Sequence, residues 1–442
     1  MSSEDLVSLR EISLKDAVEF IVDNRGKTAP TEPNGIALIA TNCVNNINLY
    51  PQKLNLRYVS LDTYNTWFRS HPIPGDILLT NKGSQNGAIC LVPDPVDFCI
   101  AQDMVALRAD AKKISLLYLF AALRSDLVQR RIKALNVDAV IPHLKKTDFN
   151  KLLIPLPDQA VQDSVGKLYF ELSARIELLR ETNATLEAIA QILFKSWFVD
   201  FAPVRAKLEG RTPEGMDEAT AALFPDGFEE SELGLVPRRW RVLRLGDATE
   251  RITKGTTPTT LKRPFVEAGI NFVKAESMTG DGGFIPEKFA FIDSETHEIL
   301  RRSQLQDADV LISIAGTIGR IAVMTNYHLP ANTNQAVALI RPLQHIFPSG
   351  LINRFLRLGT SQQQMHEKVV QAVQANLSLG TLSDLKVVVP PQEVVNKLFA
   401  SGLAQIDACW LANDQRVRTL ATLRDTLLPR LISGQLRLPK TS

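Results

Sequence analysis

Residues 75–83 read GDILLTNKG, and residues 308–316 read ADVLISIAG. In both segments an acidic residue precedes a run of apolar and β-branched residues, and a glycine ends it. This pattern predicts a strand that runs into a tight turn. Three residues of the first segment recur in the second at a constant offset of 233, namely Asp76, Leu78 and Gly83 as Asp309, Leu311 and Gly316.

The same offset continues along the chain. Further matched pairs are Gln102 and Gln335, Arg108 and Arg341, Pro157 and Pro390, Gln159 and Gln392, and Val161 and Val394. Upstream, at an offset of 231, the pairs are Leu14 and Leu245, Asp16 and Asp247, Ala17 and Ala248, and Ile21 and Ile252. One offset held from residue 76 to residue 161 indicates a tandem duplication.

Each repeat has the same order of predicted elements. Short strands come first, then shorter helices, then a proline-containing opening, and then a long helix. We therefore predict a first module at 1–157, a long helix at 158–198, a linker at 199–234, a second module at 235–391, a second long helix at 392–432 and a C-terminal tail at 433–442. The linker is acidic and contains proline and glycine throughout, which is typical of a connecting segment.

Both long helices carry an apolar stripe with steps of three and four residues, the spacing of a coiled coil. The first stripe contains Leu172, Ile176, Leu179, Asn183, Leu186, Ala190, Leu193 and Trp197, and the second contains Ile406, Trp410, Asn413, Val417, Leu420, Leu427 and Leu431. Such a stripe also suits a helix that packs on the core of its own module. Because two matched stripes occur in one chain, we favour two helices that pack on each other, antiparallel, with Asn183 and Asn413 close together.

The composition is that of an ordinary globular protein, with 442 residues, 45% hydrophobic residues, 22% charged residues and a formal net charge of +2. The sequence has no apolar run of membrane-spanning length and its first residues do not resemble a signal peptide, so we expect a cytoplasmic protein without a membrane partner. Basic residues gather locally, for example in residues 124–151. Such patches suit nucleic acid, although ordinary solvated charge explains them equally well.

Motifs for catalysis and for cofactors are missing from the sequence. We find no Walker A pattern, no GxGxxG after a strand, no GxSxG and no Pro-Pro-aromatic motif of a DNA amino-methyltransferase. The four cysteines form no CxxC pair and the six histidines have no ligand spacing. Asp309 is matched by Asp76 at a strand entry, which favours a structural role over catalysis. We therefore expect no metal, no cofactor and no catalysis by this chain alone.

The ends of the long helices carry the most distinctive sequences, LEAIAQILFKSWFVDFAPVRAK (186–207) and LATLRDTLLPRLISGQLRLP (420–439). With the helix openings IPLPDQAVQ (154–162) and VVPPQEVVN (388–396), they resemble the specificity (S) subunit of type I restriction-modification enzymes. The resemblance covers essentially the whole chain. It is specific in the helices, whereas the modules match only in outline.

The resemblance implies an α+β fold in which two target recognition domains are joined by two long antiparallel coiled-coil-like helices, with an internal pseudo-twofold duplication. Each domain would read one half of a split site in double-stranded DNA. The helices would set the spacing and dock two methyltransferase subunits, and an ATP-dependent restriction subunit would join them. The chain itself would be a non-catalytic recognition subunit.

Polar and basic residues on matched loops and basic patches are the candidates for DNA contact. They are Arg25, Lys27, Thr28, Lys82, Ser84, Gln85, Asn86, Arg124, Arg130, Arg131, Lys145 and Lys146 in the first module, and Lys254, Thr256, Thr257, Thr317 and Arg320 in the second. The candidates for the helix seam and for partner docking are Asn183, Trp197, Phe198, Asn413, Leu427 and Leu431. For each single loop residue, an exposed turn position without function explains the sequence equally well.

Two other classes of function stay open at this point. One is a single-chain nuclease or methyltransferase with its own recognition modules, which the missing motifs disfavour. The other is an orphan two-module DNA-binding regulator or scaffold that has the same fold and no catalytic partner. Co-purification of a stoichiometric methyltransferase would distinguish the specificity subunit from the regulator.

Overall fold

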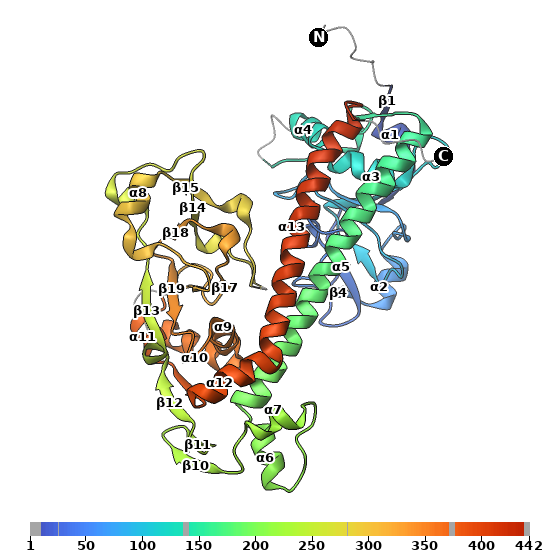
Figure 1. Ribbon diagram of the computed structural model, residues 1–442. Helices are drawn as coiled ribbons and strands as arrows, with labels where there is room; N and C mark the ends of the chain where they lie inside the picture. The colour runs from blue at the N-terminus through green and yellow to red at the C-terminus, as the bar shows by residue number, and fades with distance from the viewer. Residues whose placement is uncertain (1–9, 25, 136–140, 281, 371–375, 437–442) are drawn as a thin grey trace. The chain divides into compact units, whose positions relative to one another are not determined.

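The computed structural model describes residues 10–24, 26–135, 141–280, 282–370 and 376–436. It divides into two compact units (Figure 1). Unit 1 contains Met1–Glu181 and Asn413–Ser442, and unit 2 contains Thr182–Ala412. Each unit therefore combines one repeat with parts of both long helices, which the sequence had suggested to be separate segments.

Each unit has a four-stranded antiparallel sheet with the same strand order, which is β2-β8-β5-β6 in unit 1 and β13-β19-β16-β17 in unit 2. The strands of unit 1 are β2 (Val18–Asp23), β5 (Ile77–Thr80), β6 (Ile89–Leu91) and β8 (Met104–Ala109). Those of unit 2 are β13 (Thr249–Lys254), β16 (Val310–Ser313), β17 (Ile321–Val323) and β19 (Val337–Pro342). Matched topology in both halves confirms the predicted duplication.

The smaller sheets are duplicated as well. A three-stranded sheet has the order β4-β3-β7 in unit 1 and β15-β14-β18 in unit 2, and a two-stranded sheet pairs β1 with β9 and β12 with β20. In unit 1 these strands are β1 (Glu11–Ser13), β3 (Ile36–Ile39), β4 (Arg57–Val59), β7 (Phe98–Ile100) and β9 (Leu153–Pro155). In unit 2 they are β12 (Arg241–Arg244), β14 (Ile270–Val273), β15 (Ala290–Ile292), β18 (Ala331–Thr333) and β20 (Lys386–Val389).

The inner strands β5 and β16 are buried on both faces, which explains why they read as continuous apolar runs rather than as alternating ones, whereas the outer strands β2 and β13 keep exposed residues. Successive side chains point to opposite faces of a strand. In β5, Ile77 and Leu79 face a core that includes helices, whereas Leu78 faces the three-stranded sheet. In β16, Val310 and Leu311 divide in the same way.

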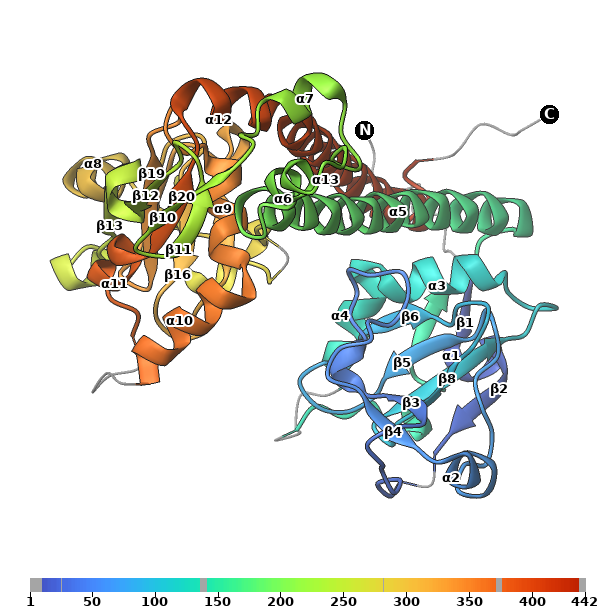
Figure 2. The same ribbon diagram turned by 90° about the horizontal axis from the view of Figure 1, so that it is seen from below.

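Short helices complete each unit (Figure 2). Unit 1 has α1 (Leu14–Ala17), α2 (Leu61–Thr66), α3 (Leu116–Arg124) and α4 (Asp126–Ala134). Unit 2 has α8 (Ser294–Ile299), α9 (Ser349–Arg357), α10 (Gly359–Val370) and α11 (Leu379–Asp384). Helix α3 packs on the four-stranded sheet of unit 1, and α9 occupies the matched place in unit 2.

A matched ion pair in each unit joins the aspartate that precedes one inner strand, β5 or β16, to an arginine of the other inner strand, β8 or β19. Arg108 donates from Nε to Asp76 Oδ1 at 3.0 Å, and Arg341 donates from Nε to Asp309 Oδ1 at 2.8 Å. The second carboxylate oxygen accepts from the guanidinium in both pairs, so each is bidentate. Both carboxylates are about 1% exposed. The structural role predicted for Asp309 is therefore confirmed.

The first long helix is α5 (Gln159–Phe198), and the second consists of α12 (Gln392–Leu398), a π-helical turn at Phe399–Leu403 and α13 (Ala404–Ile432). In unit 1, Ile176 and Leu179 of α5 pack on Val417 of α13. Earlier in α5, Ser173 accepts a hydrogen bond from Arg424 at 3.5 Å, further along α13. The predicted antiparallel pairing is thereby confirmed.

The apolar stripe serves both arrangements that the sequence left open. Its middle forms the helix-helix contact in unit 1, but the ends of both helices pack on module cores. Ala190, Phe194 and Trp197 of α5 belong to the core of unit 2. Leu428 and Leu431 of α13 belong to the core of unit 1. The coiled-coil-like part is therefore shorter than the stripe.

Residues 199–234 connect the first long helix to the second module, but they also fold as part of unit 2. They contain α6 (Ala202–Leu208), α7 (Glu218–Ala222) and β10 (Phe228–Ser231), and β10 pairs with β11 (Gly234–Pro237). Phe201 and Phe224 are 6% and 2% exposed, and both pack on Trp240. The burial of these two aromatic side chains explains why the segment folds, although its acidic composition suggested a simple connection.

Candidate nucleic-acid interface

The loops that carry the candidate residues of unit 1 meet at one end of the four-stranded sheet, where its strands run into their connecting loops. Because neighbouring strands are antiparallel, β2 and β5 end where β8 and β6 begin. The Thr28 hydroxyl donates to Gln102 Oε1 at 3.4 Å, and Lys82 Nζ lies 3.9 Å from Asp103 Oδ1. These contacts join three segments that are far apart in the sequence into one surface.

A second group of lysines reaches the same edge. Leu144 donates its N–H to the Asn81 carbonyl at 2.9 Å, so residues 144–146 lie beside the loop that comes after β5. Lys146 forms an ion pair with Asp23 at the end of β2. Lys145 is exposed. The structure therefore brings Lys145 and Lys146 together with the loop candidates, which the sequence could not show.

We call the hairpin loop between β5 and β6 loop A (residues 81–87). Lys82, Ser84 and Gln85 are exposed on it, whereas Asn86 is half-buried. Asn86 accepts a hydrogen bond from Leu144 N–H at 3.3 Å, which ties the loop to the lysine segment. Exposed side chains that both donate and accept are suited to reading base edges. We use the name edge 1 for the surface at this end of the sheet, which is formed by loop A, residues 27–28 and residues 145–146.

Unit 2 has a matched edge. We call the loop between β16 and β17 loop B (residues 314–319), and it carries the exposed Thr317. Thr257 N–H donates to Gln335 Oε1 at 3.2 Å, the counterpart of the contact between Thr28 and Gln102. We call loop B with residues 254–257 edge 2. Lys254 is exposed there and Thr256 is half-buried.

The two edges differ in charge. The residues of unit 2 that match Lys145 and Lys146 at the offset of 233 are Ser378 and Leu379. Arg320 is half-buried, and its guanidinium donates to the Met278 carbonyl at 2.9 Å. Lys254 is therefore the candidate cation of edge 2 that points to solvent. Edge 1 carries more lysines than edge 2, and two of them, Lys82 and Lys146, are paired with Asp103 and Asp23.

Three arginines of the candidate set, Arg124, Arg130 and Arg131, do not belong to edge 1. Arg124 is 7% exposed and donates to the carbonyls of Ile89, Asn45 and Asn48. Because this guanidinium is enclosed by backbone carbonyls, Arg124 supports the module and is not available to phosphate. Arg25 lies outside the described residues.

The other two arginines are on α4. Arg131 donates to the Leu153 carbonyl at 2.6 Å and forms an ion pair with Glu11 at 2.8 Å. Arg130 is exposed and donates to the carbonyl of Asp126 in its own helix. Neither contact joins the surface of edge 1.

The candidates for partner docking are mostly buried. Trp197 and Phe198 are each 4% exposed, with Trp197 packed on Phe224 and Phe198 on Trp240. Leu431 is 5% exposed and Leu427 is partly buried in the core of unit 1. The exposed large apolar residues of the long helices are different ones, namely Val161, Leu178, Ile189, Ile192 and Leu423. Sequence periodicity missed them because they lie off the main stripe.

The two asparagines of the stripes are buried, at 8% exposure for Asn183 and 5% for Asn413. In unit 2, Asn183 donates from Nδ2 to the Trp410 carbonyl at 3.1 Å. Asn413 belongs to unit 1. That the two amides lie close together stays a prediction.

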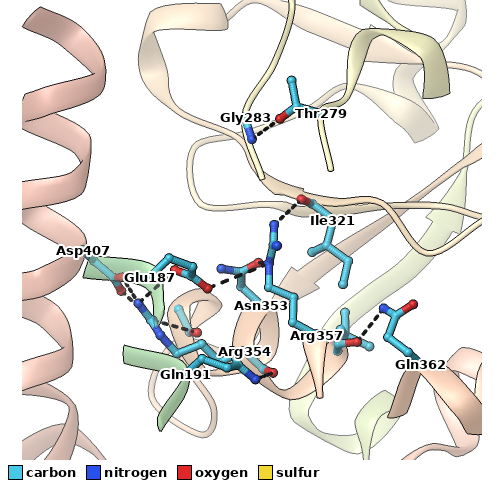
Figure 3. A network of polar contacts seen from close by, with 12 residues as sticks. Glu187, Gln191, Thr279, Gly283, Ile321, Asn353, Arg354, Arg357, Gln362 and Asp407 are labelled. Atoms are coloured by element: carbon cyan, nitrogen blue, oxygen red, sulfur yellow. Dashed lines mark hydrogen bonds and ion pairs between the residues drawn. The ribbon is translucent and has the colours of Figure 1, made fainter. Parts of the chain in front are cut away.

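A buried ionic network attaches α9 to both long helices in unit 2 (Figure 3). Arg354 is 1% exposed, and its guanidinium donates to Asp407 Oδ1 of α13 at 2.5 Å. It also lies 3.6 Å from Glu187 of α5. Burial raises the pKa of Glu187 above its ordinary value, while Arg354 and Arg357 act in the opposite direction. The network fixes α9, the helix that packs on the four-stranded sheet of unit 2, against both long helices.

Neither a metal site nor a membrane segment is found in the described ranges. No three His, Cys, Asp or Glu side chains there are grouped so that they could hold a metal ion. No helix in the same ranges is long and apolar enough to span a bilayer.

The model of the type I restriction modification DNA specificity domain matches the chain twice, at residues 11–188 and 237–419. These two ranges cover more than half of the chain and coincide with the two repeats. The chain belongs to this family. The resemblance inferred from the helix ends is thus confirmed, and a member of the specificity-subunit family is a DNA-recognition subunit rather than a catalytic one.

Two curated members of the family show how far the similarity extends. The type I restriction enzyme HindI specificity subunit of Haemophilus influenzae is 25% identical over 408 residues, which cover 82% of this chain and 86% of the relative. The MjaIX specificity subunit of Methanocaldococcus jannaschii is 24% identical, covering 72% of this chain and 69% of the relative. Low identity over most of the length fits modules that differ between members.

A solved structure shares the fold. The crystal structure of the type I restriction-modification S subunit from M. genitalium matches with a TM-score of 0.55 and 15% sequence identity, and it covers 100% of this chain and 99% of its own. At this identity the match shows a shared fold and carries no residue roles.

Proposed function

We propose that each unit reads one half of a split site in double-stranded DNA through its loop edge. Edge 1 would contact one half-site and edge 2 the other. The observation that carries this proposal is the matched position of loops A and B at the same edge of two topologically identical sheets. A duplicated reader with different loop residues is what a site with two unlike halves requires.

Charge and hydrogen bonding divide the work within edge 1. Lys145 and Lys146 are placed to contact phosphates, which position a protein on DNA without carrying sequence information. Ser84 and Gln85 are exposed on loop A and can bond to base edges in the major groove. On edge 2, Thr317 and Thr256 would read bases and Lys254 would contact phosphate.

The partners follow from membership of the family. The long helices would dock two methyltransferase subunits, and an ATP-dependent restriction subunit would join the assembly. Ile189 and Ile192, which are 45% and 68% exposed on α5, are better docking candidates than the buried Trp197 and Phe198. A complex that acts on chromosomal DNA would reside in the cytoplasm.

Paired variants of edge 1 test the division of work. The Lys145→Gln and Lys146→Gln double variant should lower DNA affinity equally for all sequences. It should also reduce the salt dependence of binding, log K against log salt, by roughly two, since each phosphate contact contributes about 0.9. The Ser84→Ala and Gln85→Ala double variant should keep that salt dependence and lose discrimination at one half-site, by roughly 10- to 100-fold.

The assay is competition binding of the assembled enzyme to duplexes with base changes in either half-site, at several salt concentrations. Arg130→Gln serves as the matched control, because Arg130 is an exposed cation of the same unit outside edge 1. If the Arg130 variant changed the salt dependence as strongly as the lysine variant does, edge 1 would not be the DNA-facing surface.

A further inference from the structure

One glutamine from the helix behind each hairpin loop holds that loop at its last residue. In unit 1, Gln129 of α4 donates from Nε2 to the Gly87 carbonyl at 2.9 Å and to the Leu123 carbonyl at 2.7 Å. In unit 2, Gln362 of α10 donates to the Gly319 carbonyl at 3.3 Å and to the Leu356 carbonyl at 2.8 Å.

The correspondence is residue by residue. Gln129 and Leu123 reach Gln362 and Leu356 at the offset of 233, and Gly87 reaches Gly319 at 232. Loop A therefore contains one residue more than loop B, yet both loops keep the same glutamine contact. Because the glutamine contact is kept while the loop changes length, the contact belongs to the structure shared by both modules and not to the part that differs between them.

The backbone at the contact admits little else. Gly87 and Gly319 have φ of +90° and +88°, in the region that favours glycine. A Cβ on Gly319 would overlap Gln362 Oε1, and a Cβ on Gly87 would lie 3.3 Å from Gln129 Oε1 and 3.2 Å from Ile132 Cγ2. The amide of each glutamine thus lies close to a glycine, and both contacts depend on this close approach.

A second contact supports the strand that follows each loop. Arg124 Nε donates to the Ile89 carbonyl at 3.0 Å, and the Arg357 guanidinium donates to the Ile321 carbonyl at 2.7 Å. Arg124 and Arg357 are again related by 233. Each loop is therefore held from the same side, by a glutamine at its end and by an arginine at the first residue of the next strand.

The helices that provide these contacts are themselves attached to the long helices. In unit 2, Arg354 of α9 forms ion pairs with Asp407 and Glu187 (Figure 3). In unit 1, a Cβ on Gly166 of α5 would overlap the Tyr118 amide nitrogen, so α5 lies directly against α3. A continuous series of close contacts thus connects each loop to the long helix in its own unit.

We propose that Gln129 and Gln362 are positioning residues for sequence reading, each of which determines discrimination at the half-site of its own module. The proposal rests on the proposed function, in which loops A and B contact bases. The glutamines do not touch DNA. They fix the carbonyl from which each loop returns to the sheet, and so they set the position of the loop side chains against the base edges.

The test uses the assembled methyltransferase with Gln129→Met or Gln362→Met in this chain. Methionine keeps the length of the side chain and removes both donated hydrogen bonds. Methylation rates are measured on the target duplex and on duplexes mismatched in one half-site. We expect Gln129→Met to reduce discrimination at the half-site of unit 1 by roughly three- to ten-fold and to leave the other half-site unchanged. Gln362→Met should do the converse.

The Gln129→Glu and Gln362→Glu variants give a readout that a loss of stability would not produce. A carboxylate places lone pairs against two carbonyl oxygens, whereas a protonated carboxyl group donates one hydrogen bond. We therefore expect discrimination at the affected half-site to improve as the pH is lowered, with the wild-type enzyme measured in parallel. Gln363→Met is the matched control, because the amide of Gln363 bonds to Glu367 on the exposed face of α10.

Equal changes at both half-sites, or none in either glutamine variant, would overturn the proposal. The substitutions of Ser84 and Gln85 separate this failure from that of the proposed function. If they alter one half-site while the glutamine variants alter neither, loop A reads bases without depending on Gln129. If they alter neither half-site, loop A is not a reader and the proposed function fails with the inference.

Discussion

Replacing Arg354 by methionine should destabilise unit 2 substantially. The substitution removes a guanidinium that is 1% exposed and leaves the carboxylates of Asp407 and Glu187 without their shared cation. Breaking a buried ion pair on one side costs about 3–5 kcal/mol. We expect the lower end, about 3 kcal/mol, because the Asp407 and Glu187 side chains are 36% and 23% exposed and water can solvate them.

The assay is urea unfolding of the full chain followed by tryptophan fluorescence. Three of the four tryptophans, Trp197, Trp240 and Trp410, belong to unit 2, so the signal reports mainly on that unit. With a denaturant dependence of about 2–3 kcal/mol per M, a loss of about 3 kcal/mol lowers the midpoint by about 1 M. Asp407→Asn should lower the midpoint less, because Arg354 still forms an ion pair with Glu187.

Arg244→Met is the matched control, since Arg244 forms an ion pair with Asp247 at 2.9 Å but its side chain is 51% exposed. We expect no measurable change of the midpoint for this variant. The double variant Arg354→Met, Asp407→Asn should be less destabilised than the sum of the single variants, because the two residues interact directly. A midpoint for Arg354→Met that matches the Arg244 control would refute the reasoning.

Two further predictions concern pH and length. Because burial raises the pKa of Glu187 above its ordinary value of 4.5, its contribution to stability is present below that value and is lost as the pH rises through the raised pKa. The unfolding free energy of wild type minus that of Glu187→Gln should therefore fall with rising pH in urea titrations, and a flat difference would contradict this. Matched seven-residue insertions after Glu181 and after Ala412 add about 10 Å to both antiparallel helices and keep the heptad phase. They should lengthen the unread spacer of the methylated motif by about three base pairs at ~3.4 Å each, whereas an insertion in α5 alone should abolish activity by breaking the register with α13.

The duplication could be predicted because it rests on residues whose physical roles leave few substitutes. Asp76 and Arg108 form a buried bidentate pair that recurs as Asp309 and Arg341, and an unpaired partner would be a buried charge. The pairing of the long helices was also predictable, since each apolar stripe needs a partner surface, and their antiparallel direction followed from the family resemblance. The folding of residues 199–234 was not, because Phe201 and Phe224 find their core only in three dimensions.

The candidate site was predicted less well than the fold, and burial is the reason. Arg124 and Lys145 are both basic residues of one module, yet Arg124 is enclosed by carbonyls and Lys145 faces solvent. Trp197 appears in the stripe as a residue for docking, but it is 4% exposed and packs on Phe224 of the connecting segment. The glutamines that hold the loops left a signal, because Gln129 and Gln362 are identical at the offset of 233.

The central claim, that two independent edges read two half-sites, is tested most directly by the methylated motif of cells that carry loop variants. Genomic methylation is mapped for the Ser84→Ala, Gln85→Ala variant of loop A and, separately, for the Thr317→Ala variant of loop B. The account predicts that the first relaxes one half of the motif, that the second relaxes the other half, and that the spacer between them keeps its length. If both variants relaxed the same half, or if either changed both halves, the claim of one reader in each module would be contradicted.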